Sequence, residues 1–405
     1  MSNNPDELSA PFTGVLRQLV FSVYAPALLM SMCQGIALLM IPLYALELGA
    51  NPGIAALIFS LFGLGNVLLD VPAGSVASRL GDKVTMIFGI GIMSLTAIGA
   101  SLADTPFQLA VCAFFFGAAL STWLIGRLTF ISDGVDEAHR GKAIATMAGL
   151  QRLGTFIGPV AGGVVATRFG FSVVFLIITC LSFVAVIFVF LFVRRGTAHL
   201  VEHDSIPSSV PRIVREHRHV FATAGLAMLM LTIVRASRQL LVPLWGESIG
   251  LDTAQIGYIV GAGSAVDMCL FPVAGYVMDN FGRRQVGISC ISVLTIGLIA
   301  VPFSSSAMTL ALAAILIGMG NGLGSGINLT LGADLSPVSN RGEFLGVWRL
   351  MADVGSFGGP LLIGFVITAF TLPAAFGVTT IAGITGVGLM FFLVPETRPA
   401  RTPLP

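Results

Sequence analysis

Eight ionisable side chains lie inside long apolar segments of this sequence, where a charged group is costly unless it has a partner or faces a cavity. They are Arg127, Arg152, Arg235, Arg238, Arg349, Asp70, Asp267 and Asp353. An arginine stays charged and binds anions, whereas an aspartate in apolar surroundings can take up and release a proton. The loops hold no nucleophile with a neighbouring base and no compact set of metal ligands. The sequence therefore predicts neither an enzyme nor a metal or cofactor site.

Three of these groups lie deep within their segments. Arg152 and Asp353 each follow an arginine at a loop edge by 12 residues, which is about 18 Å of helix at 1.5 Å per residue. Asp267 lies eight residues before Gly275, at the edge of another loop. Asp267 and Asp353 are therefore the best candidates for proton carriers, unless an arginine holds them ionised.

A further polar group lies around position 235. Arg235 and Arg238 are three residues apart, so they lie roughly on one helix face, and Gln239 follows them. Two guanidinium groups without an acid nearby would attract an anionic group. Gln34 occupies the place equivalent to Arg235 in the first half of the chain.

The segments that hold these residues form a duplicated chain. Motifs of the first half return 201 residues later: Pro42-Leu43-Tyr44 as Pro243-Leu244-Trp245, Arg140-Gly141 as Arg341-Gly342, and Gly154-Thr155-Phe156-Ile157-Gly158-Pro159 as Gly355-Ser356-Phe357-Gly358-Gly359-Pro360. Three matches in one register predict two homologous halves packed about a pseudo-symmetry axis.

The composition indicates that both halves lie in a lipid bilayer. Of the 405 residues, 55% are hydrophobic and 10% are charged, which cannot give a water-soluble core a polar surface. Apolar runs long enough to cross about 30 Å of hydrocarbon lie near 18–46, 52–77, 84–103, 106–132, 142–167, 171–193, 220–246, 254–278, 285–305, 307–333, 343–369 and 374–394. The runs do not alternate in polarity, so we expect an all-α membrane protein with about twelve transmembrane helices in two six-helix halves.

The basic residues predict the orientation of the chain. Almost all lysines and arginines of the loops fall on one side of the predicted spans, whereas the opposite loops carry mainly acids. Since basic loops stay in the cytoplasm, we expect both termini there, in a bacterial cytoplasmic (inner) membrane. The net charge of +1 gives no indication of nucleic-acid binding.

One long polar stretch, 194–219, separates the two halves. It holds four of the five histidines, but their spacing lacks a compact ligand set, so we interpret it as a solvated cytoplasmic linker. The expected domains are an N-terminal six-helix half over 1–193, this linker, and a C-terminal six-helix half over 220–405. The five cysteines are scattered singly and indicate no disulfide framework.

The loop after the second span of the second half has a distinctive pattern. It reads Gly275-Tyr276-Val277-Met278-Asp279-Asn280-Phe281-Gly282-Arg283-Arg284. This order resembles the signature loop of the major facilitator superfamily of transporters. The resemblance implies a latch on one alternating-access state, in which glycine lets helices approach and arginine pairs with a neighbouring acid. The residues assigned to this latch are Gly74, Arg79, Asp133, Gly275, Asp279, Arg283 and Asp334. The first-half copy departs from the pattern, with Ser78 in place of the aspartate and Asp82 in place of the arginine.

The fifth span carries a second resemblance. Gly154, Gly158 and Pro159 are similar to the glycine-proline pattern that marks antiporters of this superfamily, which favours the drug/proton antiporter branch. The alternative interpretation is that these residues only bend and pack the helix. The same pattern recurs at Gly359 and Pro360 in the second half, which fits this alternative. The arginine that drug/proton antiporters usually carry in the fourth span is absent, and the first span has no acid.

The resemblance also implies which spans meet. In the family fold the fifth span lies beside the eighth and the second beside the eleventh, which implies the ion pairs Arg152–Asp267 and Asp70–Arg349. The second pair could be purely structural. The family lines a central cavity with its first and seventh spans, which implies a substrate site containing Gln34, Arg235, Arg238 and Gln239. The expected site also includes Asn321 and Asn328 of the tenth span and Arg127 of the fourth.

Together these features predict a secondary active transporter that exports a small amphiphilic or drug-like compound, coupled to protons, by alternating access. Two alternatives are an importer or facilitator of a small metabolite such as an organic acid or sugar, and a non-transporting membrane receptor or scaffold. The expected partners are a small-molecule substrate, protons and the lipid bilayer, and the family's usual state is a monomer.

Overall fold

The computed structural model describes residues 19–134, 137–193 and 210–398. This part of the chain is helical apart from short turns and contains no strand. The first half comprises η2 (Val20–Tyr24), α2 (Ala25–Glu47), α3 (Pro52–Leu80), α4 (Asp82–Ser101), α5 (Pro106–Gly134), α6 (Glu137–Phe169) and α7 (Phe171–Phe192). The second half comprises α8 (Val210–Glu216), α9 (Arg218–Val220), η4 (Phe221–Gly225), α10 (Leu226–Ser248), α11 (Thr253–Phe281), α12 (Arg283–Ala300), η5 (Val301–Phe303), α13 (Ala307–Leu323), α14 (Ile327–Leu335), α15 (Arg341–Ala369) and α16 (Leu372–Phe392).

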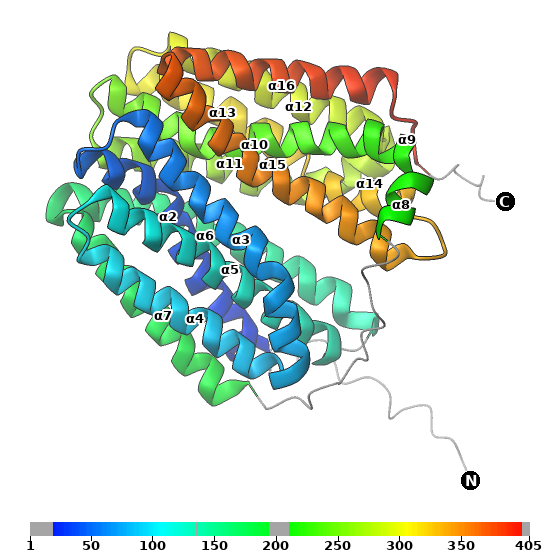
Figure 1. The fold of residues 1–405 in the computed structure, drawn as a ribbon, viewed down its shortest axis with the longest axis horizontal. Helices are drawn as coiled ribbons and strands as arrows, with labels where there is room; N and C mark the ends of the chain where they lie inside the picture. Colours follow the sequence, from blue (N-terminus) through cyan, green and yellow to red (C-terminus); the bar gives the residue numbers. More distant parts are fainter. Residues whose placement is uncertain (1–18, 135–136, 194–209, 399–405) are drawn as a thin grey trace.

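Eleven spans of the described residues are long and apolar enough to cross a membrane. The remaining long helix, α6, is more polar because its first turns carry loop charges and Arg152 lies farther along. It nevertheless packs in the bundle between α2 and α11. The predicted all-α membrane fold of about twelve helices in two halves is confirmed. Figure 1 shows the first half (blue to green) gathered on one side of the second (green to red).

The sequence repeat reappears as repeated contacts. The Tyr44 hydroxyl donates to the carbonyl of Ala103 at 2.7 Å, and 201 residues later the Trp245 indole donates to the carbonyl of Ser304 at 3.0 Å. Helix starts repeat as well, since Asn51 caps α3 and Asp252 caps α11, each through its side-chain oxygen. The two halves therefore share their internal packing as well as their sequence pattern.

The turns that follow α3 and α11 also match. Gly81 and Gly282 have φ of +81° and +98°, a conformation that favours glycine. The cations just beyond, Lys83 and Arg284, donate to the carbonyls of Phe190 and Phe391 respectively. These contacts tie the start of the third helix to the end of the sixth helix in each half.

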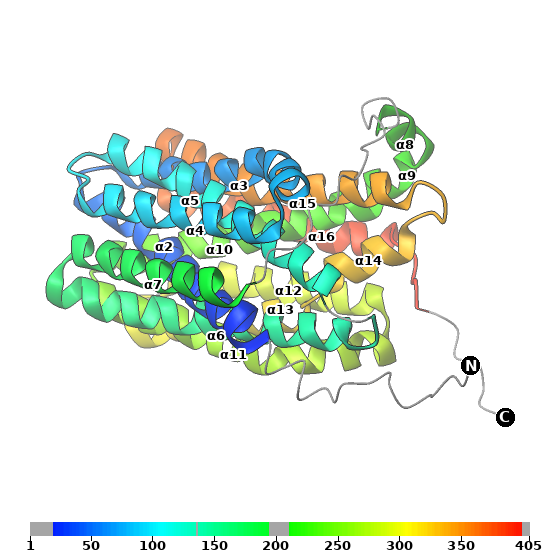
Figure 2. The same ribbon diagram turned by 90° about the horizontal axis from the view of Figure 1, so that it is seen from below.

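The halves meet chiefly along two helix pairs, α6 with α11 and α3 with α15, and α2 also contacts α10 (Figure 2). The backbones approach most closely near the loops at 48–52 and 249–252, where a Cβ added at Gly257 would lie 2.5 Å from the Pro159 carbonyl. The Thr167 hydroxyl there accepts a hydrogen bond from the backbone N–H of Ala254 at 2.9 Å. The inter-half interface is therefore tight at this end of the bundle.

The opposite end carries the basic loops, and there the glycines of the expected latch have room. A Cβ built at Gly74 or Gly275 meets nothing within 4 Å. The expectation that these glycines permit close helix contact is thus not met in this structure, because the halves are packed together at the other end.

The expected linker is partly helical. Residues 194–209 lie outside the described part, whereas Val210–Glu216 forms α8. On α8 the Arg212 Nε donates to Glu216 Oε1 at 2.7 Å, and this hydrogen bond lowers the pKa of the Glu216 carboxyl.

Candidate functional site

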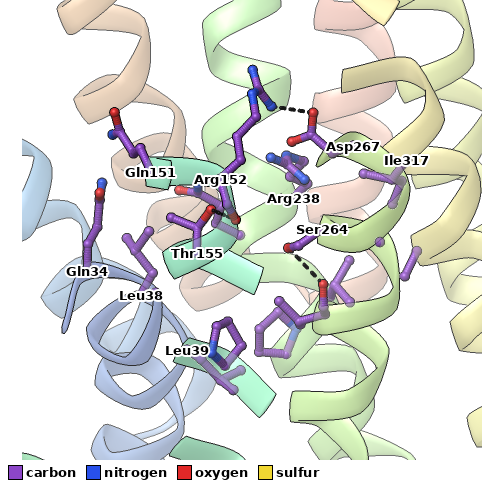
Figure 3. Close-up of a pocket in the computed structure, with 18 of the residues that line it drawn as sticks. Gln34, Leu38, Leu39, Gln151, Arg152, Thr155, Arg238, Ser264, Asp267 and Ile317 are labelled. Atoms are coloured by element: carbon purple, nitrogen blue, oxygen red, sulfur yellow. Dashed lines mark hydrogen bonds and ion pairs between the residues drawn. The ribbon is translucent and has the colours of Figure 1, made fainter. Parts of the chain in front are cut away.

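A cavity of about 330 Å³ lies between the halves, lined by α2, α6, α10, α11 and α13. Figure 3 shows Gln34 and Gln151 on one wall, and Arg238, Ser264 and Asp267 across from them. Apolar side chains such as Leu38 and Ile317 fill the spaces between the polar groups. A chamber of mixed polarity halfway between two helical halves suits a small amphiphilic solute.

The cavity contains the first expected ion pair. Arg152 Nη1 on α6 lies 2.5 Å from Asp267 Oδ1 on α11, and Arg152 Nη2 donates to Ser325 Oγ at 2.9 Å. Asn321 Nδ2 donates to the other oxygen, Oδ2, of Asp267 at 2.7 Å. The guanidinium group also lies over the ring of Phe271, 4.5 Å from its centroid. Both oxygens of the carboxylate are occupied, so the pair is firmly held and joins the two halves.

The second arginine of the cavity is in a different situation. Arg238 on α10 lines the cavity, and its Nε is buried with no hydrogen-bond partner among the described residues. Arg238 also forms none of the ion pairs found in that part of the chain. Gln34 and Gln239 line the cavity as expected. A charged donor thus faces the chamber without a fixed counter-ion.

Arg235 does not line the cavity, which differs from the expectation. It donates through Nη2 to the carbonyl of Gly324 at 2.9 Å and lies 3.6 Å from the Sγ of Cys290. Gly324 is the C-cap that follows α13, and Gly326 adopts a left-handed φ of +83° before α14 begins. The helix break frees a carbonyl that Arg235 satisfies, so this arginine stabilises the break.

Three other residues expected to bind substrate lie outside the cavity lining. Arg127 is 3% exposed, and its Nη2 donates to Gln151 Oε1 at 3.0 Å. Asn321 supports Asp267, as described above. Asn328 Oδ1 accepts from the Trp348 indole at 2.9 Å. The polar groups of these three residues form hydrogen bonds with other side chains of the helical bundle and do not face the chamber.

The second expected pair belongs to a larger cluster between α3 and α15. Arg349 Nη2 lies 2.6 Å from Asp70 Oδ2, and Ser121 donates to the other oxygen of Asp70. Arg349 Nε lies 3.6 Å from Asp353 Oδ2, one helical turn along α15. One guanidinium group therefore serves two carboxylates, and Asp353 holds it more weakly.

The second-half latch residues come together at the basic end. Arg283 lies 3.3 Å from Asp279 and 3.2 Å from Asp334. Sequence reasoning missed Glu396, whose carboxylate accepts from the backbone N–H groups of Arg283 at 2.8 Å and Arg284 at 3.1 Å. The sequence does carry a signal for Glu396, because it is an acid that follows the last span directly, on the side of the basic loops. In the first half, Arg79 lies in the last turn of α3, and the side chain of Asp133 lies outside the described residues.

The three glycines assigned to helix packing in the fifth spans, Gly154, Gly158 and Gly359, lie against helices of their own halves. A Cβ at Gly158 would lie 2.6 Å from the carbonyl of Met32 on α2. Gly154 also packs against α2, while Gly359 lies against Ile233 on α10. Pro159 and Pro360 lie inside α6 and α15, and Pro159 also lines the cavity. These glycines bring the first helix of each half close to its fifth.

Two related bundles of apolar helices around a chamber of mixed polarity are the architecture of a membrane transporter. The chain belongs to the Major Facilitator Superfamily, whose sequence model matches residues 24–237 and 221–405.

Similar proteins include efflux pumps. The chain is 24% identical to the multi-drug resistance efflux pump PmrA homolog of Lactococcus lactis, over 80% of this chain and 81% of that protein. It is 21% identical to the multidrug resistance protein MdtG of Salmonella choleraesuis, over 84% and 86% of the two chains. An uncharacterised transporter of the same superfamily from Methanocaldococcus jannaschii is 20% identical over 94% of this chain and 99% of that one.

Solved structures share the fold. The nucleoside transporter NupG has a TM-score of 0.74 at 15% identity, covering 93% of this chain and all of NupG. A D-xylose–proton symporter has a TM-score of 0.72 at 13% identity, covering 93% and 98% of the two chains.

Proposed function

We propose that this protein exports a small amphiphilic or drug-like compound in exchange for protons, by alternating access. The observation that carries this proposal is the cavity between the halves, in which an inter-half ion pair lies beside an apolar surface. The chain's similarity to two proteins named for multidrug resistance supports efflux as the direction.

The closely packed end of the bundle supports an assignment of this structure to one state of the alternating-access cycle. The backbones of α6 and α11 are packed closely at the loops that carry few basic residues, while the glycines near the basic end have open space. If the basic loops are cytoplasmic, the cavity is closed toward the outside. Transport then requires α6 and α11 to separate at the closed end while the basic end packs together.

The Arg152–Asp267 pair is suited to control that movement. It joins α6 to α11, so the two helices cannot separate freely while the pair is intact. Protonation of Asp267 removes the charge that attracts Arg152, and a substrate that competes for either partner weakens the pair in the same way. We assign Asp267 the role of proton carrier linked to substrate arrival.

Asp353 is the second proposed carrier. It shares Arg349 with Asp70, and its contact with the guanidinium is the longer of the two, at 3.6 Å against 2.6 Å. The facing charged groups are Asp70 from α3 and Arg349 from α15, with the Ser121 hydroxyl of α5 behind Asp70. Two carboxylates and one arginine leave one negative charge, which a proton can neutralise without breaking the pair of Asp70 with Arg349.

A facilitator or importer of a small metabolite is the second candidate. It is favoured by the absence of an acid within the first span, since α2 carries none before its last residue, Glu47. In this alternative the ion pairs would gate the movement without carrying protons.

Everted membrane vesicles, energised to be acid inside, test the proposal. A pH-sensitive dye reports the internal acidity while cationic, neutral and anionic amphiphiles are added one at a time. We expect at least one class of compound to cause alkalinisation that vesicles without the protein do not show. No response to any compound, in vesicles shown to contain folded protein, would contradict proton-coupled export and favour the facilitator.

A further inference from the structure

The positive charges of the cavity wall outnumber its negative charges. Of the residues that line it, Arg152, Arg238 and Asp267 are ionisable. Asp267 is engaged through both oxygens, by Arg152 and by Asn321. Two guanidinium groups and one carboxylate give the wall one net positive charge, which resides on Arg238.

Among the described residues, no carboxylate forms an ion pair with Arg238. Its Nε is buried without a hydrogen-bond partner among the described residues, and Figure 3 shows its guanidinium group beside the chamber. The charged groups that act on it include the carboxylate of Asp267, which is already paired, and the like charges of Arg235 and Arg152. A guanidinium group withdrawn from water needs an anion close by, and the open side of this one is the cavity.

We infer that the substrate of this cavity is an organic monoanion, whose negative group pairs with Arg238 while its apolar body lies against the aliphatic wall. This inference rests on the proposed function, because it names the class of compound transported through the same chamber. Leu38, Leu39, Val242, Val260 and Ile317 supply the aliphatic surface. A carboxylate or sulfonate on a hydrophobic ring or chain has the required chemistry.

The other arginines are unsuitable as the anchor. Arg152 donates hydrogen bonds from its two terminal nitrogens to Asp267 and Ser325. Arg235 is turned to the Gly324 carbonyl, away from the chamber. Arg127 lies behind the wall, bonded to Gln151. Among these arginines, Arg238 alone lines the chamber without forming an ion pair with a carboxylate of the described residues.

Arg127 contributes as a positioning residue. An arginine can only donate, so Gln151 must present its oxygen to Arg127, and this fixes the amide so that its NH₂ group is the end left for other contacts. Gln151 lines the cavity wall that faces Arg238 in Figure 3. The chamber therefore offers a second donor to the oxygens of an anion.

Paired acid and amide probes test the inference on the full-length protein in lipid nanodiscs. Equilibrium binding of 2-naphthoate and 2-naphthalenesulfonate is compared with that of 2-naphthamide, which has the same ring and no charge. We expect the wild type to prefer the anions by about tenfold or more, as charge-assisted hydrogen bonds are about twice as strong as neutral ones. Arg238→Gln should bring the preference close to one, and Arg238→Lys should keep part of it because the charge remains.

Two further variants separate charge recognition from damage to the fold. Arg212→Gln alters an exposed arginine on α8 and should leave the preference unchanged. Arg127→Gln should reduce the acid preference severalfold without abolishing it, a change in selectivity that a purely structural role would not cause. Thermal melting of each variant shows whether it is folded.

Equal binding of 2-naphthoate and 2-naphthamide to the wild type would overturn the inference, as would an acid preference retained by folded Arg238→Gln. Failure of both anions to bind would overturn it too. If anions bind but cause no proton-linked flux in vesicles, the proposed function fails while the charge preference stands. If only neutral or cationic compounds are transported, the inference fails while proton-coupled export stands.

Discussion

Asp353 occupies in the second half the position that Arg152 occupies in the first, 201 residues earlier, so two equivalent places carry opposite charges. Arg152 reaches across the α6–α11 interface to Asp267, whereas Asp353 shares Arg349 with Asp70 at the α3–α15 interface. The duplicated fold has diverged into a positively charged cavity on one side and a negatively charged cluster on the other. This asymmetry separates the proposed substrate site from one of the proposed proton sites.

Replacement of Asp267 by asparagine is the first test of proton coupling. Asparagine cannot release a proton at Asp267's place, so we expect Asp267→Asn to abolish substrate-driven alkalinisation in everted vesicles while exchange of labelled substrate for unlabelled substrate continues. Glu247→Gln, in the last turn of α10, serves as the control because its side chain is exposed. Full proton coupling in folded Asp267→Asn would contradict the assignment of Asp267 as a proton carrier.

The Asp70–Arg349 pair is suited to a double-mutant cycle. Arg349→Gln leaves Asp70 and Asp353 without a guanidinium group, and we expect it to lower the melting temperature of the purified protein. Because half of the Arg349 side chain is exposed, the loss should be about 1 kcal/mol or less rather than the larger cost of a fully buried pair. Removing Asp70 as well, in Asp70→Asn with Arg349→Gln, should recover part of that loss. Strictly additive effects would show that the two residues are not coupled.

Two replacements, one in the fifth span of each half, test the glycine pattern of these spans. A Cβ at Gly158 would lie 2.6 Å from the Met32 carbonyl and 2.9 Å from the Ile36 nitrogen, so Gly158→Ala must push α2 and α6 apart. We expect it to destabilise the protein by about 1–3 kcal/mol. Gly358 has nothing within 4 Å, so Gly358→Ala should be neutral or stabilising by about 0.5–1 kcal/mol. Melting temperatures in detergent measure both, and similar values for the two would contradict the packing role.

Glu396 provides a test at the start of α12. Its two carboxylate oxygens accept from the first backbone N–H groups of that helix, as an N-terminal cap does. We expect Glu396→Ala to cost about 1 kcal/mol of stability, and Glu396→Gln to cost less, since an amide oxygen can still accept one of these bonds. An unchanged melting temperature for Glu396→Ala would show that water replaces the cap at no cost.

Residue spacing predicted some contacts and misjudged others for a geometric reason. Arg235 and Arg238 are three residues apart, which on a helix of 3.6 residues per turn separates them by about 60°. That angle is enough for one side chain to face the cavity while the other points into its own half toward Gly324. In the same way, the sequence could not show that Arg127 and Gln151, 24 residues apart, would face each other.

The sequence by itself determined that this protein lies in a membrane as two related bundles. Apolar run length is set by bilayer thickness, and the 201-residue repeat is visible without any structure. It also marked the depth of the buried charges. The tertiary structure alone decided which of those charges are neutralised. Arg152 and Asp267 are 115 residues apart and meet only through the packing of α6 on α11. Arg238 lines the same cavity and forms no ion pair with any residue that the structure describes. Charge pairing inside a bilayer depends on distances of a few ångströms, and only the packed helices set these distances.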